Sequence, residues 1–468
     1  MAKIPLTGKH KGASASAGVP RRAAPSRGVP RYAGVLILTA LVFSCATRNE
    51  VYRDIDANVA RDAYTDALSI INKRHSAIYP KKNKVLLHLD KGILEHYAGN
   101  YKNSSADLEA ADELIERYFA KSITQSATSF IANDNVKDYA GEEYENIYLN
   151  VFNALNYYHA GKFDDALVEI RRVNEKLLQL EDKYAKAIEK AKKADEKYGR
   201  GVKSGERARF NNSALARYLG ALLYRADGRQ DDARIDFAAI ETAYKTAPNV
   251  YPFSCAEAFK AKGEPGYETG PELQIPRGKA RLNVIAFTGL GPYKEEENTI
   301  IPLPLPAPNN FARIALPRLV NRPSSVSRVS VSVSGAGNAA FNLDLLEDLG
   351  LAAAETFKAS YGLTVVKTSM RSIIKQTVGA GLAGAAEEQG GSALGLLVGI
   401  ATTIANTASE QADTRISRYL PRYAFAGGIN LDPGEYTVRI SFTGGNIQEK
   451  TIKVKAGALN LIEAFYLH

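Results

Sequence analysis

The chain contains only two cysteines, Cys45 and Cys255, among its 468 residues. Two cysteines are too few for a cysteine-rich metal site. If Cys45 carries a lipid anchor, as argued below, Cys255 has no partner for an internal disulfide. We expect Cys255 to be a small, partly buried residue. The six histidines add no metal site, because none of them stands at metal-ligand spacing with a third ligand nearby.

Local catalytic motifs are missing as well. The sequence has no Gly-x-Ser-x-Gly nucleophile elbow, and no Cys/His pair is credible when Cys45 is acylated. Residues 199–205 match a phosphate-binding loop in composition but not in residue order. His88 and His96 stand about two helical turns apart, and surface positions on a helix explain them. We therefore predict a protein without enzymatic activity, metal or cofactor. A catalytic site assembled from distant residues would leave no local motif, so an enzyme remains an alternative.

Acidic residues are missing from the first 49 positions, and seven lysines and arginines precede Cys45. The apolar run 33–44 that follows is too short to span a bilayer as a helix, which needs roughly 20 residues. Basic residues followed by a short apolar run are typical of a secretory leader. Ser44 before Cys45, with an aliphatic Val42, resembles a bacterial lipobox, in which the cysteine thiol is acylated.

The sequence therefore predicts a lipoprotein-type signal peptide over residues 1–44 and a mature chain anchored in a membrane by acyl chains such as palmitate on Cys45. An ordinary cleaved signal peptide and an uncleaved short anchor remain alternatives. Ala46 replaces the aspartate that retains lipoproteins in the inner membrane of some Gram-negative bacteria. We expect a cell-envelope location, at the outer membrane and facing the periplasm.

The formal net charge of +9 does not indicate a nucleic-acid partner. Seven of the positive charges precede Cys45, so the mature chain is near +2. No basic stripe with interleaved aromatic residues remains to bind phosphates.

The composition changes near residue 250, and we predict an α+β multidomain protein. Residues 45–250 are rich in Ala, Leu, Tyr, Glu and Lys at helical spacing, whereas residues 276–468 are rich in Val, Gly, Pro and Ser with alternation. The Pro- and Gly-containing residues 251–275 cannot continue a helix and are interpreted as a linker, where limited proteolysis should cut.

The helical half shows three helix–turn–helix patterns with the spacing of tetratricopeptide units. Their turn glycines are Gly99, Gly161 and Gly228, and small residues near the start of each second helix allow close packing. The second pattern continues into a long charged helix over 166–198, which is either a solvated helix or a partner-binding arm. Four tyrosines could line a peptide groove, although core packing explains them equally well: Tyr144, Tyr148, Tyr157 and Tyr158.

The second half shows alternating segments typical of strands, at 281–287, 326–333, 437–442, 451–454 and 459–466. We expect the last three to form antiparallel hairpins in a β-sandwich-like domain. A helical insertion over 343–413 interrupts this domain. It carries Gly391, Gly395 and Gly399 at four-residue spacing, which favours a helix buried on the sheet, with membrane insertion or oligomer formation as alternatives.

The chain resembles a family of bacterial envelope lipoproteins with tetratricopeptide-like helices and no assigned activity. The matching residues are Tyr157, His159, Ala160, Gly161 and Phe163; Gly289, Gly291, Pro292 and Lys294; Arg371; Ala412 to Arg415; and Leu420 with Pro421. Ser417 stands where that family has Trp, a residue type that this chain lacks. The resemblance implies location and architecture, and little chemistry.

One polar cluster is a candidate site, formed by Arg371, Asp413, Arg415 and Arg418. It is interpreted as ion pairs that join the insertion to the sheet, or as a pocket for an anionic ligand. The function predicted from the sequence is a non-catalytic scaffold for protein–protein interaction or assembly. The alternative is a glycan- or peptidoglycan-binding protein, which an exposed aromatic strip at Phe442, Phe465 and Tyr466 would favour.

Overall fold

A computed structural model describes residues 47–124, 135, 137–198, 210, 212–262, 270–302, 311–335, 337–358, 360–362, 364–365, 367–369, 371–372 and 411–468. Tyr52–His468 forms one compact unit and Met1–Val51 another, and the account below concerns the first. The predicted leader, Cys45 and the three insertion glycines lie outside the described residues. Within the described part of the chain, no helix combines the length and apolar character needed to cross a membrane.

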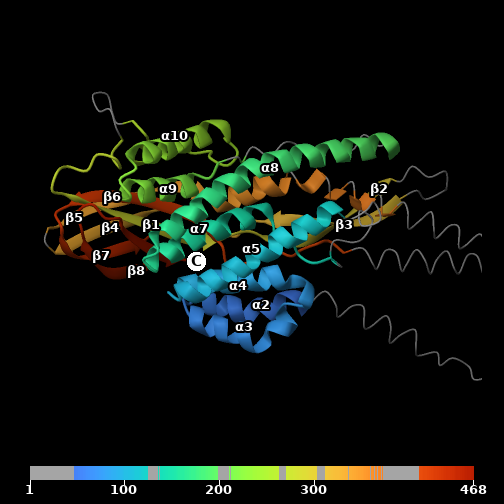
Figure 1. Cartoon of the computed structure of the whole chain (residues 1–468). Coiled ribbons are helices and arrows are strands. Elements are labelled where there is room, and N and C mark those ends of the chain that lie inside the picture. The colour runs from blue at the N-terminus through green and yellow to red at the C-terminus, as the bar shows by residue number, and fades with distance from the viewer. Residues whose placement is uncertain are drawn as a thin grey trace, which may run out of the picture. The chain divides into compact units, whose positions relative to one another are not determined.

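The first part of the unit is helical (Figure 1). Its α-helices are α2 (Thr47–Val59), α3 (Tyr64–Ile78), α4 (Lys84–Tyr97), α5 (Tyr101–Thr124), α7 (Glu143–His159), α8 (Phe163–Tyr198), α9 (Ala214–Ala226) and α10 (Gln230–Thr246). Short 3-10 turns occupy Lys81–Asn83 and Glu257–Phe259.

The predicted helix pairs are confirmed as α4–α5, α7–α8 and α9–α10. The glycines that separate them, Gly99, Gly161 and Gly228, have φ values of 77°, 71° and 77°. This left-handed backbone favours glycine because a Cβ atom would clash with the following carbonyl oxygen. Leu167, Ile170, Val173, Leu177 and Leu180 form the buried stripe of α8, as their spacing predicted.

The described residues of the second part of the unit form two sheets. The strands are β1 (Ala280–Leu290), β2 (Tyr293–Pro302), β3 (Phe311–Val320), β4 (Val329–Gly335), β5 (Ala339–Asp348), β6 (Pro421–Leu431), β7 (Gly434–Phe442), β8 (Ile447–Val454) and β9 (Asn460–Tyr466). Strands β2 and β3 form an antiparallel ribbon, and the other seven form one sheet in the order β8-β7-β4-β5-β6-β1-β9.

The seven-stranded sheet curls until it is nearly closed. Its edge strands β8 and β9 meet through side chains, because the Gln448 amide donates to the Phe465 carbonyl at 2.5 Å. Valine, isoleucine and leucine side chains of β1, β4 and β7 fill the interior. On β4 and β7, buried residues alternate with more exposed ones, as the sequence pattern predicted.

Two expectations about the sheet were wrong. Strand β9 pairs in parallel with β1, with Ile462 opposite Val284, and does not form a hairpin with β8. Residues 343–348 belong to strand β5, so the helical part of the insertion begins at residue 349. Strand β9 prefers β1 because six of its seven residues are buried, which requires cover on both faces.

The helices of the first part of the unit, called the helical layer below, pack on the outer face of the seven-stranded sheet. Strand β1 is buried on both faces, since Val284 points into the sheet interior while Phe287 meets Phe152 of α7 at a ring distance of 5.2 Å. Residues on both sides of the expected linker therefore share one compact unit. The linker itself contributes to the core through Phe259 and Glu272, while Cys255 is free and half-buried, as expected.

Candidate functional site

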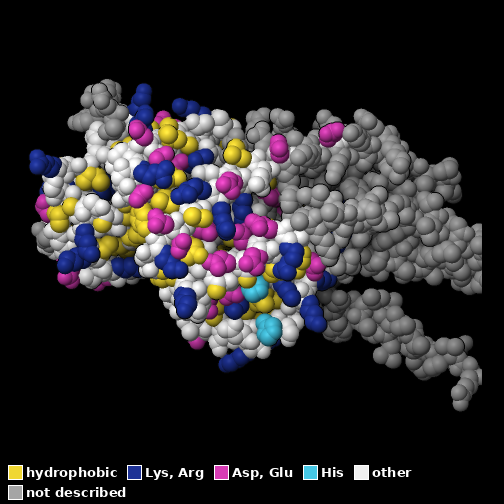
Figure 2. All heavy atoms as spheres, viewed as in Figure 1, with side chains coloured by type: hydrophobic (Ala, Val, Ile, Leu, Met, Phe, Trp, Pro, Cys, Tyr) yellow, Lys and Arg dark blue, Asp and Glu magenta, His cyan; other side chains and the backbone are white. Residues whose placement is uncertain are grey.

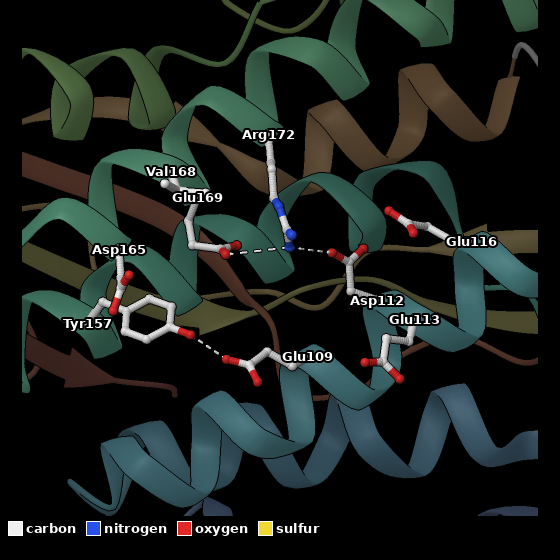
Figure 3. A pocket seen from close by; sticks show the side chains of 9 residues that line it. All are labelled: Glu109, Asp112, Glu113, Glu116, Tyr157, Asp165, Val168, Glu169 and Arg172. Atoms are coloured by element: carbon white, nitrogen blue, oxygen red, sulfur yellow. Dashed lines mark hydrogen bonds and ion pairs between the residues drawn. The ribbon is translucent and has the colours of Figure 1, made fainter. Parts of the chain in front are cut away.

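An acidic groove of about 320 Å³ lies on the helical layer, between α5 on one side and α7 and α8 on the other (Figure 3). Six carboxylate side chains and one guanidinium line it, together with Tyr157 and Val168. Acidic side chains also gather over these helices in the space-filling view, among scattered basic ones (Figure 2). The lining residues are Glu109, Asp112, Glu113, Glu116, Tyr157, Asp165, Val168, Glu169 and Arg172.

Helix periodicity places four of these acids together. Glu109, Asp112, Glu113 and Glu116 are three or four residues apart along α5, so they share one face of that helix. The opposite wall comes from the start of α8, where Asp165 and Glu169 stand one turn apart. The residues that line the groove therefore carry a net negative formal charge, with six acidic side chains and one arginine.

Arg172 crosses the middle of the groove. Its guanidinium lies 3.3 Å from Asp112 and 3.5 Å from Glu169, and so joins the two walls (Figure 3). Burial raises the pKa of Glu169, although Asn150 donates a hydrogen bond to its carboxylate. Tyr157 donates its hydroxyl hydrogen to Glu109, while among the described residues Glu113 has no hydrogen-bond or ion-pair partner.

The four tyrosines expected in a peptide groove do not lie together on the surface. Tyr144 and Tyr148 are buried, and Tyr148 donates to Glu347 of β5. Tyr158 accepts a 3.0 Å hydrogen bond from the Leu461 amide of β9. Only Tyr157 faces the acidic groove. Tyr148 and Tyr158 therefore contact strands of the sheet and do not line a surface groove.

The predicted polar cluster is divided between separate contacts. Arg415 donates two hydrogen bonds of 2.8 and 2.7 Å to Asp413, whereas Arg418 forms an ion pair with Asp56 of α2 at 2.6 Å. The Nη2 group of Arg371 donates to the Thr368 hydroxyl at 2.9 Å. The Arg418 ion pair thus ties residues 411–420 to α2, whereas the Arg415 ion pair stays within this segment, and Arg415 reaches Asn83 and the Lys137 carbonyl through hydrogen bonds of 3.3 and 2.9 Å.

Buried carboxylates of the helices hold residues 411–420. Asp90 of α4 accepts the Ser417 hydroxyl at 2.8 Å and the Arg418 amide at 3.0 Å, and Glu145 of α7 accepts the Ser417 amide. Burial raises the pKa of Asp90 to about 6. Burial, together with the nearby Glu142, raises the pKa of Glu145 to about 8.

A further buried carboxylate connects the sheet to α9. Glu347 of β5 reaches the N-terminus of this helix, where it accepts the Leu215 amide at 2.6 Å and the hydroxyl of the N-cap residue Ser213 at 3.0 Å. The positive end of the helix favours a carboxylate here. Burial nevertheless outweighs these contacts and raises the pKa of Glu347 to about 7.

Sequence reasoning missed the contact between His96 and Glu463. His96 is completely buried, contrary to the expected surface position, and its Nε2 lies 3.0 Å from the Glu463 carboxylate of β9. His88, the other histidine of α4, is partly exposed and lies 2.8 Å from Asp107. The signal was Glu463 itself, a single carboxylate in the otherwise apolar run 461–466.

The aromatic strip that would favour glycan binding is not exposed, since Phe442 and Phe465 are buried and Tyr466 is half-buried. The described residues also contain no cluster of three or more His, Cys, Asp or Glu side chains arranged to hold a metal ion. Comparison of the chain with protein-family models, curated proteins and solved structures finds no match.

Proposed function

We propose that this chain is a non-catalytic, lipid-anchored protein of the bacterial cell envelope that binds a protein partner through its acidic groove. The helix pairs would act as degenerate tetratricopeptide-type units, with their inner face covered by the chain's own sheet. The observation that carries this proposal is the groove, which concentrates six carboxylates on the face that the sheet leaves open. Its charge favours a partner segment rich in lysine and arginine.

The second support is the leader, with its basic residues, short apolar run and Cys45. Palmitate labelling of the wild type, Cys45→Ala and Cys255→Ala tests the anchor. We expect label and membrane association to be lost with Cys45→Ala and kept with Cys255→Ala, which removes the other cysteine. Equal labelling of wild type and Cys45→Ala would refute lipidation at this residue.

Site-specific cross-linking tests the groove. A photoreactive residue at Glu113 should cross-link a partner in intact envelopes, and the double substitution Glu109→Lys with Glu116→Lys should abolish that product. The matched control is a photoreactive residue at Glu449, an exposed acid on β8 outside the groove. A product that forms equally at both positions, or that survives the charge reversal, would contradict a groove-mediated contact.

A further inference from the structure

A chain of hydrogen bonds fixes the proton positions around His96. The Ser104 hydroxyl donates to the Gly92 carbonyl at 2.6 Å, so its oxygen accepts the Asn156 amide NH2 at 2.8 Å. This orients the Asn156 amide with its oxygen toward His96, whose Nδ1 lies 2.7 Å away. Because a carbonyl oxygen can only accept, the Nδ1 atom of His96 must carry a proton.

The other ring nitrogen of His96 also faces an acceptor. Its Nε2 lies 3.0 Å from Glu463 Oε2, and the second oxygen of this carboxylate contacts Nε2 of His159. With Asn156 and the ionised Glu463 as acceptors at its two nitrogens, His96 satisfies both partners only as an imidazolium. Four aromatic rings surround this cation, those of Tyr97, Tyr101, Phe152 and Phe465, at 5.1 to 6.0 Å from the imidazole.

Few other charges face this pair. The Lys450 ammonium of β8 donates to the backbone carbonyl of Glu463. On β1, the apolar Ile285 stands opposite Glu463. The hydroxyls of Tyr97 on α4, Tyr101 on α5 and Tyr158 on α7 are near enough for the Glu463 charge to raise their pKa values, after burial, which is the larger cause. Histidine protons therefore supply most of the positive charge around Glu463.

We propose that His96 and Glu463 form a proton-controlled lock, in which the imidazolium of α4 and the carboxylate of β9 hold the last strand against the helices. Loss of either charge opens this lock, so that the last strand is no longer held against the helices. Burial alone would raise the pKa of Glu463, but His96 and His159 outweigh burial and hold it well below its usual range. The lock therefore stays closed in mild acid and opens only when the pH falls through that lowered value.

Nuclear magnetic resonance of the ¹⁵N-histidine-labelled wild-type chain tests the protonation directly. We expect both ring nitrogens of His96 to be protonated at neutral pH. We also expect any pH change that removes the charge of His96 or of Glu463 to accelerate amide exchange across Asn460–Tyr466, with β7 as the internal reference. An unprotonated ring nitrogen on His96 at neutral pH would overturn the proposal, and so would a proton loss without any change in strand exchange.

Two substitutions on α4 provide a matched comparison. His96→Gln removes the cation from the buried pair, and His88→Gln removes the partly exposed histidine beside Asp107. His96→Gln leaves the buried Glu463 carboxylate with one histidine partner instead of two, so it should accelerate amide exchange in β9 by about a hundredfold and abolish this pH dependence. His88→Gln should change neither. Wild-type exchange and pH dependence in His96→Gln would refute the lock.

Discussion

Substitution of Glu272 should show how strongly the helical layer and the sheet depend on each other. This carboxylate is completely buried between α9 and β1. It accepts two hydrogen bonds of 2.7 Å from Arg281, one of 2.8 Å from Arg225 and one of 2.8 Å from Asn283. Glu272→Gln keeps the shape of the side chain and removes the negative charge between the two guanidinium groups.

The expected loss is large because removing one partner leaves buried charges without compensation. Such changes typically lower the free energy of unfolding by about 3 to 5 kcal/mol. Burial alone would raise the pKa of Glu272, but Arg281 and Arg225 outweigh it and lower the pKa from its ordinary value of 4.5 to about 2. At 1.36 kcal/mol per pH unit, that difference corresponds to about 3 kcal/mol of stability at neutral pH, which agrees with the mutational figure.

The pH dependence has a definite sign. Since the pKa of Glu272 is lower in the folded state than in the unfolded one, its stabilisation is complete above about pH 5 and is lost as the pH falls toward 2. Denaturant unfolding at several pH values should show this decline in the wild type. In Glu272→Gln, the free energy of unfolding at neutral pH should be lower than in the wild type. It should also fall less as the pH is lowered, because a glutamine at this position does not titrate.

The matched control is Glu449→Gln on β8. Glu449 also pairs with an arginine, Arg439, at 2.7 Å, but both side chains are about half exposed, at 51% and 56%. Exposed pairs contribute about 0 to 1 kcal/mol, so this change should have little effect. If Glu272→Gln costs less than about 1 kcal/mol, or no more than the control, the buried ion pairs do not couple the two layers.

Three further outcomes follow. Gly92→Ala should lower the free energy of unfolding in denaturant by about 1 to 3 kcal/mol, because the added Cβ atom would lie 2.6 Å from the side chain of buried Leu108. Gly337→Ala, where the added Cβ atom meets open space, should be neutral, and equal effects of the two substitutions would contradict this packing. Since burial raises the pKa of Glu347 to about 7, the free energy of unfolding should fall as the pH rises from about 4.5 to 7, and Glu347→Gln should flatten this slope; an unchanged slope would argue against it. A protease cut within residues 248–275 should leave the two fragments together in size-exclusion chromatography until denaturant is added, because buried ion pairs join both sides; separation without denaturant would contradict the single unit.

Features set by local residues were predictable from the sequence. The turn of each helix pair follows from a glycine with positive φ, such as Gly161, and the buried stripe of α8 follows from 3.6-residue periodicity. Strands β4 and β7 follow from alternation over a few residues. The parallel pairing of β9 with β1 has no such signal, because its partners lie more than 170 residues apart, as Ile462 and Val284 do.

Buried polar residues were the main failure of sequence reasoning. Hydrophobic patterns assign charged residues to the surface, so His96 and Glu272 were not counted among the core residues. His96 nevertheless follows Ile93 by three positions and Leu89 by seven, which places it on the apolar face of α4. The tetratricopeptide-type assignment and the lipid anchor remain predictions, as does the role of the insertion glycine Gly395.

The acidic groove itself works against the stability of α5. Like charges three or four residues apart destabilise a helix by about 0.2 to 0.5 kcal/mol per pair, and Glu113 stands in such pairs with both Glu109 and Glu116. Glu113→Gln should therefore raise the free energy of unfolding by about 0.5 kcal/mol at low salt, and the gain should shrink at 1 M salt, where charges are screened. Glu449→Gln, which breaks an attractive pair, should show no gain. If Glu113→Gln both stabilises the fold and lowers cross-linking to the partner, binding explains why an acidic residue stands at this position. A Glu113→Gln variant less stable than wild type would instead make these carboxylates part of the fold.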